Sequence, residues 1–137
     1  MLYYLDTSIW LDIFEDRDEP NLPKSKYARE LINKIVIRRD KIIISNAIYE
    51  ELLDLGYNIF EIKGLFREFR GIVIYMGFDK MQYGKAKDLA YKRDIPKFDA
   101  LHAILARDNN ATLISRDYPH FKKLTDITTF HKPEEVI

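Results

Sequence analysis

The stretch LYYLDTSIW, residues 2–10, decides how the fold begins. A run of four apolar residues stops at an acid, Asp6, and apolar residues resume after two hydroxyl side chains. A short, continuous apolar run is typical of a strand that is buried on both faces of a parallel sheet. We therefore expect a strand over residues 2–5 and a helix over residues 7–14. Asp6, at their junction, has two compatible interpretations: a helix cap and a metal ligand.

Strand and helix patterns alternate along the rest of the chain. Short β-branched runs such as KIIIS, residues 41–45, lie between segments in which apolar residues recur at helical spacing. Strands that alternate with helices form right-handed crossovers, which place helices on both faces of a parallel sheet. We expect an α/β fold, with further helices at 27–38, 47–55, 59–69, 79–93 and 99–107, and further strands at 41–45, 71–76, 112–115 and, at one edge, 126–130.

The composition is that of an ordinary soluble protein. We interpret the 137 residues as a single domain, residues 1–137. The lack of cysteine excludes disulfides, thiolate metal sites and a thiol nucleophile, and it fits a reducing, cytoplasmic location. We expect neither a signal peptide nor a membrane span, which needs roughly 18 apolar residues. The 22 basic and 22 acidic side chains cancel, so any attraction to nucleic acid must be local.

Acidic side chains fall where the expected strands end. Asp6 follows the first strand, Glu51 lies in the helix after the second, Asp99 opens a helix, and Asp117 follows the strand TLIS. All strands of a parallel sheet finish at one edge, and ligands bind there, at the point where the strand order reverses. We expect at least three of these acids to lie close together at that edge.

Glu51 is the most informative of these acids. Its helix places Ile48, Leu52 and Leu55 on one face, and Glu51 lies on that face, whereas Glu50 points to the opposite, solvated side. An ionised carboxylate that faces a core is costly unless it is paired or bound to a cation. The pattern therefore favours Glu51 over Glu50 as a functional acid. The alternative is a Glu whose stem packs while its head reaches water.

The acids also have ordinary explanations, since Asp6, Asp99 and Asp117 are each placed to cap a helix. Separate caps do not explain why the acids gather at one edge. A convergent acidic pocket repels itself and needs a divalent cation, and oxygen ligands select Mg²⁺ or Mn²⁺. Such an ion supports phosphoryl chemistry. The hydroxyls of Thr7 and Ser115 are candidates to hold ligands or waters beside it.

Four motifs, LDTSIW, SNAIYEEL, FDALHAILA and TLISRD, resemble in order and spacing the successive motifs of the PIN domain family, and most of all the VapC toxins of VapBC toxin–antitoxin systems. The resemblance runs from Leu2 to about Phe130. It implies a three-layer α/β/α sandwich with a central parallel sheet, and an endoribonuclease that depends on Mg²⁺ or Mn²⁺. It also implies an RNA substrate, a small antitoxin partner that blocks the site, and a homodimer. The family's acids fall on Asp6, Glu51, Asp99 and Asp117, and its hydroxyls on Thr7 and Ser115.

Several basic residues flank two of the acidic motifs and are expected to form a local rim for RNA phosphates. The alternative is solvated surface charge. These residues are Lys92, Arg93, Lys97 and Arg116. His102 follows Asp99 by three residues, and we interpret it as a structural, hydrogen-bonding residue.

Other functions stay open. A catalytically silent PIN-like module would work through its partner or dimer surface, and an RNA-processing nuclease would share the chemistry but not the toxin role. A phosphatase with Asp6 as nucleophile is a further possibility, although Ser8 stands where its companion acid would be.

Overall fold

A wholly parallel five-stranded sheet forms the centre of the computed structural model, which describes residues 1–137. The strand order is β3-β2-β1-β4-β5. The strands are β1 (Leu2–Leu5), β2 (Lys41–Ser45), β3 (Val73–Met76), β4 (Thr112–Ile114) and β5 (Phe130–His131). The chain adds β2 and β3 on one side of β1 and then β4 and β5 on the other. The strand order therefore reverses beside β1, and a crevice is expected beyond the carboxyl ends of β1 and β4.

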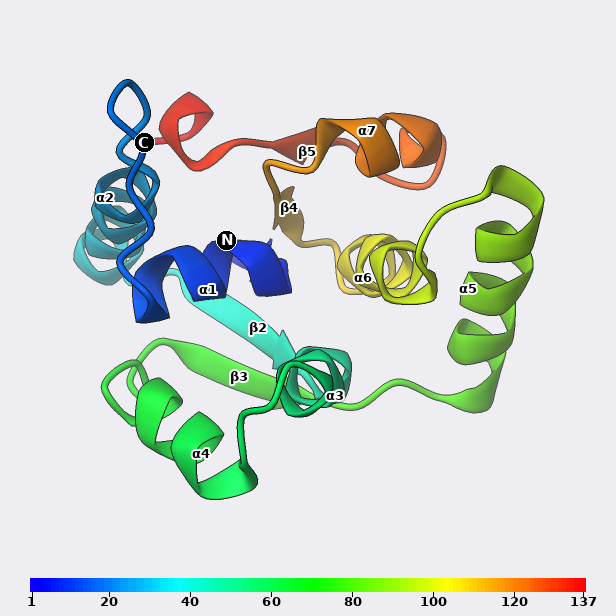
Figure 1. The fold of residues 1–137 in the computed structure, drawn as a ribbon, viewed down its shortest axis with the longest axis horizontal. Coiled ribbons are helices and arrows are strands. Elements are labelled where there is room, and N and C mark those ends of the chain that lie inside the picture. Colours follow the sequence, from blue (N-terminus) through cyan, green and yellow to red (C-terminus); the bar gives the residue numbers. More distant parts are fainter.

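Helices cover both faces of the sheet, which confirms the three-layer α/β/α sandwich. The helices α1 and α2 lie on one side, and α6, with α5 outside it, lies on the other (Figure 1). No helix has both the length and the apolar character needed to cross a membrane. The helices are α1 (Thr7–Phe14), α2 (Lys24–Arg38), α3 (Asn46–Asp54), α4 (Ile59–Arg67), α5 (Lys80–Arg93), α6 (Lys97–Asp108) and α7 (Tyr118–Phe121).

The core lies on both sides of the central strands. Ile42, Ile43 and Ile44 are consecutive in β2 and all fully buried, as a strand between two helical layers requires. Trp10 of α1 is also fully buried, and its ring meets the ring of Phe66 in α4 edge-on, with centroids 4.9 Å apart. This aromatic packing joins α1 and α4 on one face of the sheet.

The C-terminal part of the chain differs most from the expectation. The last strand was expected at 126–130 but comprises Phe130–His131, because Ile127 and Thr128 donate backbone hydrogen bonds to Leu124 (2.9 and 3.1 Å) and form a turn. The short helix α7 was not among the expected elements, although the interpretation of Asp117 as a helix cap agrees with it. At the N-terminal side, α2 begins at Lys24, three residues earlier than expected.

Candidate active site

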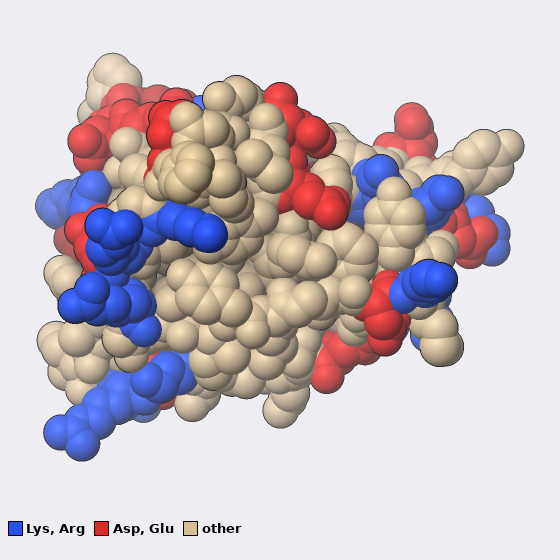
Figure 2. Space-filling view, turned by 90° about the horizontal axis from the view of Figure 1, so that it is seen from below, with Lys and Arg blue, Asp and Glu red and all other residues tan.

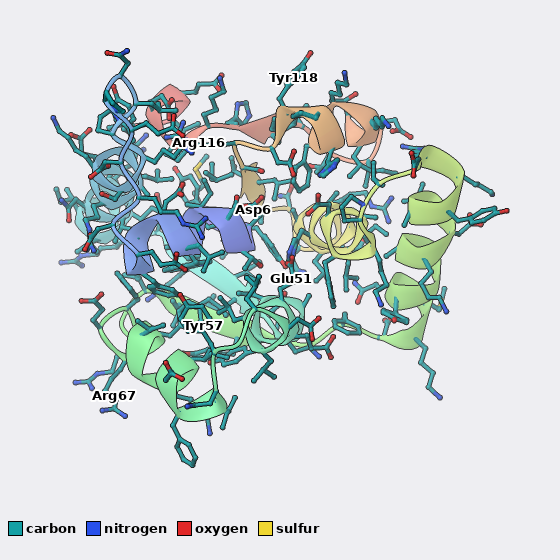
Figure 3. All side chains as sticks on the ribbon, viewed as in Figure 1. Asp6, Glu51, Tyr57, Arg67, Arg116 and Tyr118 are labelled. Atoms are coloured by element: carbon teal, nitrogen blue, oxygen red, sulfur yellow. The ribbon has the colours of Figure 1, made fainter.

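A pocket of about 260 Å³ opens beyond the carboxyl ends of β1 and β4. It is lined by all four of the acids singled out in the sequence, together with His102 and His120. Asp6 lies at the start of α1 and Glu51 projects from α3 toward the same space, beside α6 (Figure 3). The fold therefore brings together side chains that lie more than a hundred residues apart in the sequence, at the point where the strand order reverses.

Asp6 caps helix α1 and also lines the pocket. Its Oδ1 accepts hydrogen bonds from the backbone N–H of Ile9 (3.2 Å) and the hydroxyl of Ser8 (2.7 Å). Its Oδ2 accepts one from Ser115 Oγ (2.6 Å), which confirms that this hydroxyl lies beside the acid. Burial raises the pKa of Asp6, although these hydrogen bonds oppose the rise. Three donors thus hold the buried carboxylate in one orientation.

Glu51 is fixed by two neighbours on one oxygen. Its Oε1 accepts a hydrogen bond from Thr7 Oγ1 (2.7 Å) and another from His102 Nε2, so Oε2 carries no hydrogen bond within the protein. Burial opposes ionisation, but the hydrogen bond and charge of His102 hold the pKa of Glu51 below its ordinary value. The adjacent Glu50 is exposed, as expected. The expected burial of Leu55 is wrong: helix α3 ends at Asp54, and Leu55 lies exposed at the rim of the pocket.

A buried chain of hydrogen bonds holds His102 in turn. Its Nδ1 lies 2.6 Å from the hydroxyl of Tyr4, which lies 2.6 Å from Ser45 Oγ. Tyr4 and Ser45 are fully buried and His102 nearly so, and burial raises the pKa of Tyr4. Burial lowers the pKa of His102, but the hydrogen bond and charge of Glu51 outweigh this and leave it above the ordinary value. The contact of Nδ1 with Tyr4 and that of Nε2 with Glu51 hold the ring of His102 from both sides. This confirms the hydrogen-bonding role expected for His102.

Asp99 does not cap its helix, contrary to one interpretation of the sequence. The N-cap of α6 is Pro96, and Asp99 lies in the first turn. Burial raises the pKa of Asp99 to about 6; Asp6, Asp117 and Glu51 add to the rise, and His102 opposes it. The carboxylates therefore repel one another in the absence of a cation.

Asp117 caps α7 and is linked to Asp6 through a shared hydroxyl. Ser115 Oγ donates to Asp6 and accepts from the backbone N–H of Asp117 (3.0 Å). On the other side, the Nδ1 of His120 lies 2.6 Å from Asp117 Oδ2 and 2.9 Å from Asp99 Oδ2. Sequence reasoning missed His120. The only signal was its position three residues after Asp117, which has meaning only once α7 is known to be helical.

The residues of this pocket fit a hard divalent cation. Carboxylate oxygens are the ligands that Mg²⁺ and Mn²⁺ prefer, and four carboxylates line one pocket. Single ligand atoms from Asp99, Asp117 and His120 all lie within 4.8 Å of one another. Burial and the neighbouring carboxylates raise the pKa of Asp99, and a bound cation would relieve the repulsion among these carboxylates.

The four basic residues expected to form a rim all contact groups of the same chain. Three of them pair with acids, and the fourth, Lys97, donates a hydrogen bond to the hydroxyl of Tyr83 (2.9 Å). On the face shown in Figure 2, the basic side chains gather mainly toward two sides and leave a broad uncharged area in the middle. The three ion pairs are Lys92–Asp88 (2.9 Å), Arg93–Asp126 (2.6 Å) and Arg116–Glu134 (2.7 Å).

Comparison with known proteins agrees with this fold. The family model described as the PIN domain matches residues 3–126. The complex VapBC2 from Rickettsia felis, bound to a DNA fragment from its promoter, contains a chain with a TM-score of 0.69 and 18% identity, covering 96% of this chain and 98% of that one. A chain of VapBC-1 from nontypeable Haemophilus influenzae has a TM-score of 0.66 and 22% identity, with 98% of this chain and 99% of that one covered. A chain of FitAcB from Neisseria gonorrhoeae has a TM-score of 0.62 and 19% identity, with 98% of this chain and 99% of that one covered. A search of curated proteins gives no significant match.

Proposed function

Since this chain belongs to the PIN domain family, we propose that it is a divalent-metal-dependent endoribonuclease that hydrolyses phosphodiester bonds in RNA. The observation that carries the proposal is the meeting of four acids in one pocket at the switch point of the sheet. The resemblance to VapC toxins supports RNA as the substrate and Mg²⁺ or Mn²⁺ as the ion.

The four acids divide into two pairs by the way the protein holds them. Asp6 and Glu51 are oriented by hydrogen bonds from Ser115 and Thr7, so their carboxylates are positioned before any ligand binds. The side chains of Asp99 and Asp117 instead both contact the imidazole of His120. We propose that all four hold the ion, directly or through its waters. When bound, the ion polarises the scissile phosphate and lowers the pKa of the attacking water.

The charge of the pocket bears on the substrate. Four carboxylates would repel a phosphodiester, and three of the four neighbouring basic residues pair with acids of the same chain. The ion would therefore supply the positive charge that attracts RNA, because a bound divalent cation is the largest local charge in such a site. We expect RNA binding to depend on the metal as strongly as cleavage does.

We propose further that the chain is the toxin of a toxin–antitoxin pair. Its fold matches chains of VapBC and FitAcB complexes over nearly their whole length. A small antitoxin protein would then cover the pocket. The VapC resemblance also supports a homodimer, which light scattering on the purified protein would test, and a cytoplasmic location.

The adjacent acids Glu50 and Glu51 provide a matched test of the proposal. Glu50 is exposed, whereas Glu51 lines the pocket, so Glu50→Gln and Glu51→Gln remove the same charge one residue apart. The wild type and both variants would be incubated with a pool of short fluorescent RNAs, with EDTA, Mg²⁺ or Mn²⁺, and circular dichroism would check the fold.

We expect cleavage by the wild type and by Glu50→Gln only when a metal ion is present. Glu51→Gln should cleave at least a hundredfold more slowly, on the order of the effect of losing a metal-positioning group. Cleavage in EDTA, or equal cleavage by a folded Glu51→Gln variant, would contradict the proposal. Failure of the wild type to cleave any RNA in the pool would favour the silent binding module instead.

A further inference from the structure

His120 occupies the space between two acids of the pocket. Its Nδ1 lies 2.9 Å from Asp99 Oδ2 and 2.6 Å from Asp117 Oδ2. Asp99 belongs to α6, whereas Asp117 is the N-cap of α7. The side chain of His120 is 38% exposed, so the ring reaches the pocket from the solvent side. In contrast, His102 is buried, and both of its ring nitrogens are engaged, one with Tyr4 and the other with Glu51.

The structure of α7 explains how His120 reaches this place. Asp117 caps the helix, and its Oδ1 accepts a hydrogen bond from the backbone N–H of His120 (3.4 Å). Pro119 stands in the first turn, where its fixed backbone angle favours the helix. Phe121 is almost fully buried and anchors α7 on the core. The backbone of His120 is therefore held between a cap and an anchor, and its imidazole is directed at the two acids.

The Nδ1 of His120 lies about as far from each carboxylate oxygen as neighbouring ligands of one ion lie from each other, and its 2.6 Å contact with Asp117 Oδ2 is a hydrogen bond in this structure. In an octahedral site with ligand bonds of about 2.1 Å, adjacent ligand atoms lie about 3 Å apart. The two distances from Nδ1 to the carboxylate oxygens, 2.9 and 2.6 Å, are close to that value. One ligand atom from each of the three residues lies within 4.8 Å of the other two. Binding a cation there would replace the hydrogen bond between Nδ1 and Asp117 Oδ2.

We propose that His120 is a nitrogen ligand of the cation in this pocket and that it favours Mn²⁺ over Mg²⁺. The inference rests on the metal site of the proposed function and adds a ligand to its four acids. Mg²⁺ takes oxygen ligands and keeps several of its waters. A first-row transition ion accepts an imidazole nitrogen together with carboxylates, so one histidine ligand shifts the preference of the site toward Mn²⁺.

The test is pulsed electron paramagnetic resonance on the Mn²⁺-loaded full-length chain, because a directly bound imidazole nitrogen couples to the electron spin of Mn²⁺. The variants are His120→Ala, His102→Ala and, as a matched control, His131→Ala, whose side chain does not line the pocket. Titration calorimetry with Mn²⁺ and with Mg²⁺ gives the affinities of the same proteins, and circular dichroism checks their folds.

We expect nitrogen coupling in the wild type and in His131→Ala, and its loss in His120→Ala. The Mn²⁺ affinity of His120→Ala should fall roughly 10- to 100-fold, and its Mg²⁺ affinity by less than about threefold. Bound Mn²⁺ without nitrogen coupling, coupling that survives in His120→Ala, or equal losses for the two ions would overturn the assignment. If the wild type binds no Mn²⁺, the metal site of the proposed function fails and this inference fails with it.

Discussion

Replacing Asp99 by asparagine should stabilise the metal-free protein. Burial and the neighbouring carboxylates raise the pKa of Asp99 from its ordinary 3.8 to about 6, so its ionised form is disfavoured in the folded state. At about 1.4 kcal/mol per pH unit, this rise costs the wild type about 3 kcal/mol of stability at pH 8. Asparagine carries no charge and avoids the cost, and it has nearly the same size and shape as aspartate.

The sign of the pH dependence follows from proton binding. Between pH 3.8 and about 6 the folded wild type binds more protons at Asp99 than the unfolded chain does, so its stability falls as the pH rises through this window. The advantage of Asp99→Asn should therefore be about 1 kcal/mol at pH 4.5 and about 3 kcal/mol at pH 8. At pH 8 this corresponds to a rise in Tm of roughly 10 °C for a chain of this length.

Urea unfolding in EDTA at both pH values measures these differences. Asp88→Asn is the control, because Asp88 is exposed and pairs only with Lys92 on the surface of α5; its effect should stay within about 0.5 kcal/mol. Added Mn²⁺ should raise the stability of the wild type but not of Asp99→Asn. An Asp99→Asn variant that is less stable than the wild type at pH 8, or one with the same gain in unfolding free energy at both pH values, would show that the folded protein does not disfavour the ionised form of Asp99.

Three further perturbations probe the groups that support the site. Tyr4→Phe leaves the buried Nδ1 of His102 without its hydrogen-bond partner. The free energy of unfolding in urea should therefore fall by about 1–3 kcal/mol. An unchanged free energy would show that this hydrogen bond does not stabilise the fold. Ser115→Ala removes a hydrogen bond to Asp6 and should weaken Mn²⁺ binding in calorimetry by roughly 10- to 100-fold; full affinity would show that the hydroxyl is dispensable. Arg116→Ala breaks a half-buried ion pair and should lower the unfolding free energy by about 1–3 kcal/mol; a loss below about 0.5 kcal/mol would count against a structural role for this pair.

The beginning of the fold was readable from the sequence because local patterns specify it. An unbroken apolar run followed by a capping acid places the β1–α1 junction at Asp6, and the residues of both elements lie where they were expected. The helical face of α3 likewise separates Glu51 from Glu50 without reference to the rest of the chain. Where burial alone determines a helix or a strand, the spacing of apolar residues predicts that element.

The remaining features depend on contacts between distant segments. Arg116 lies beside an acidic motif, but its partner Glu134 comes from the C-terminal turn, so the sequence could not show that its charge is neutralised. The role of His120 depends on α7, a helix of four residues that is too short for a periodic pattern. The last strand, Phe130–His131, is likewise too short to give a recognisable sequence pattern, and its pairing with β4 defines it.

The central claim is that the pocket binds a divalent cation through its acids. Titration calorimetry with Mn²⁺ on the wild type and on Asp99→Asn, with circular dichroism to confirm that both are folded, tests it most directly. We expect the wild type to bind Mn²⁺ and a folded Asp99→Asn variant to lose this binding. A wild type that binds no Mn²⁺, or an Asp99→Asn variant that binds it equally well, would show that these acids do not form a cation site.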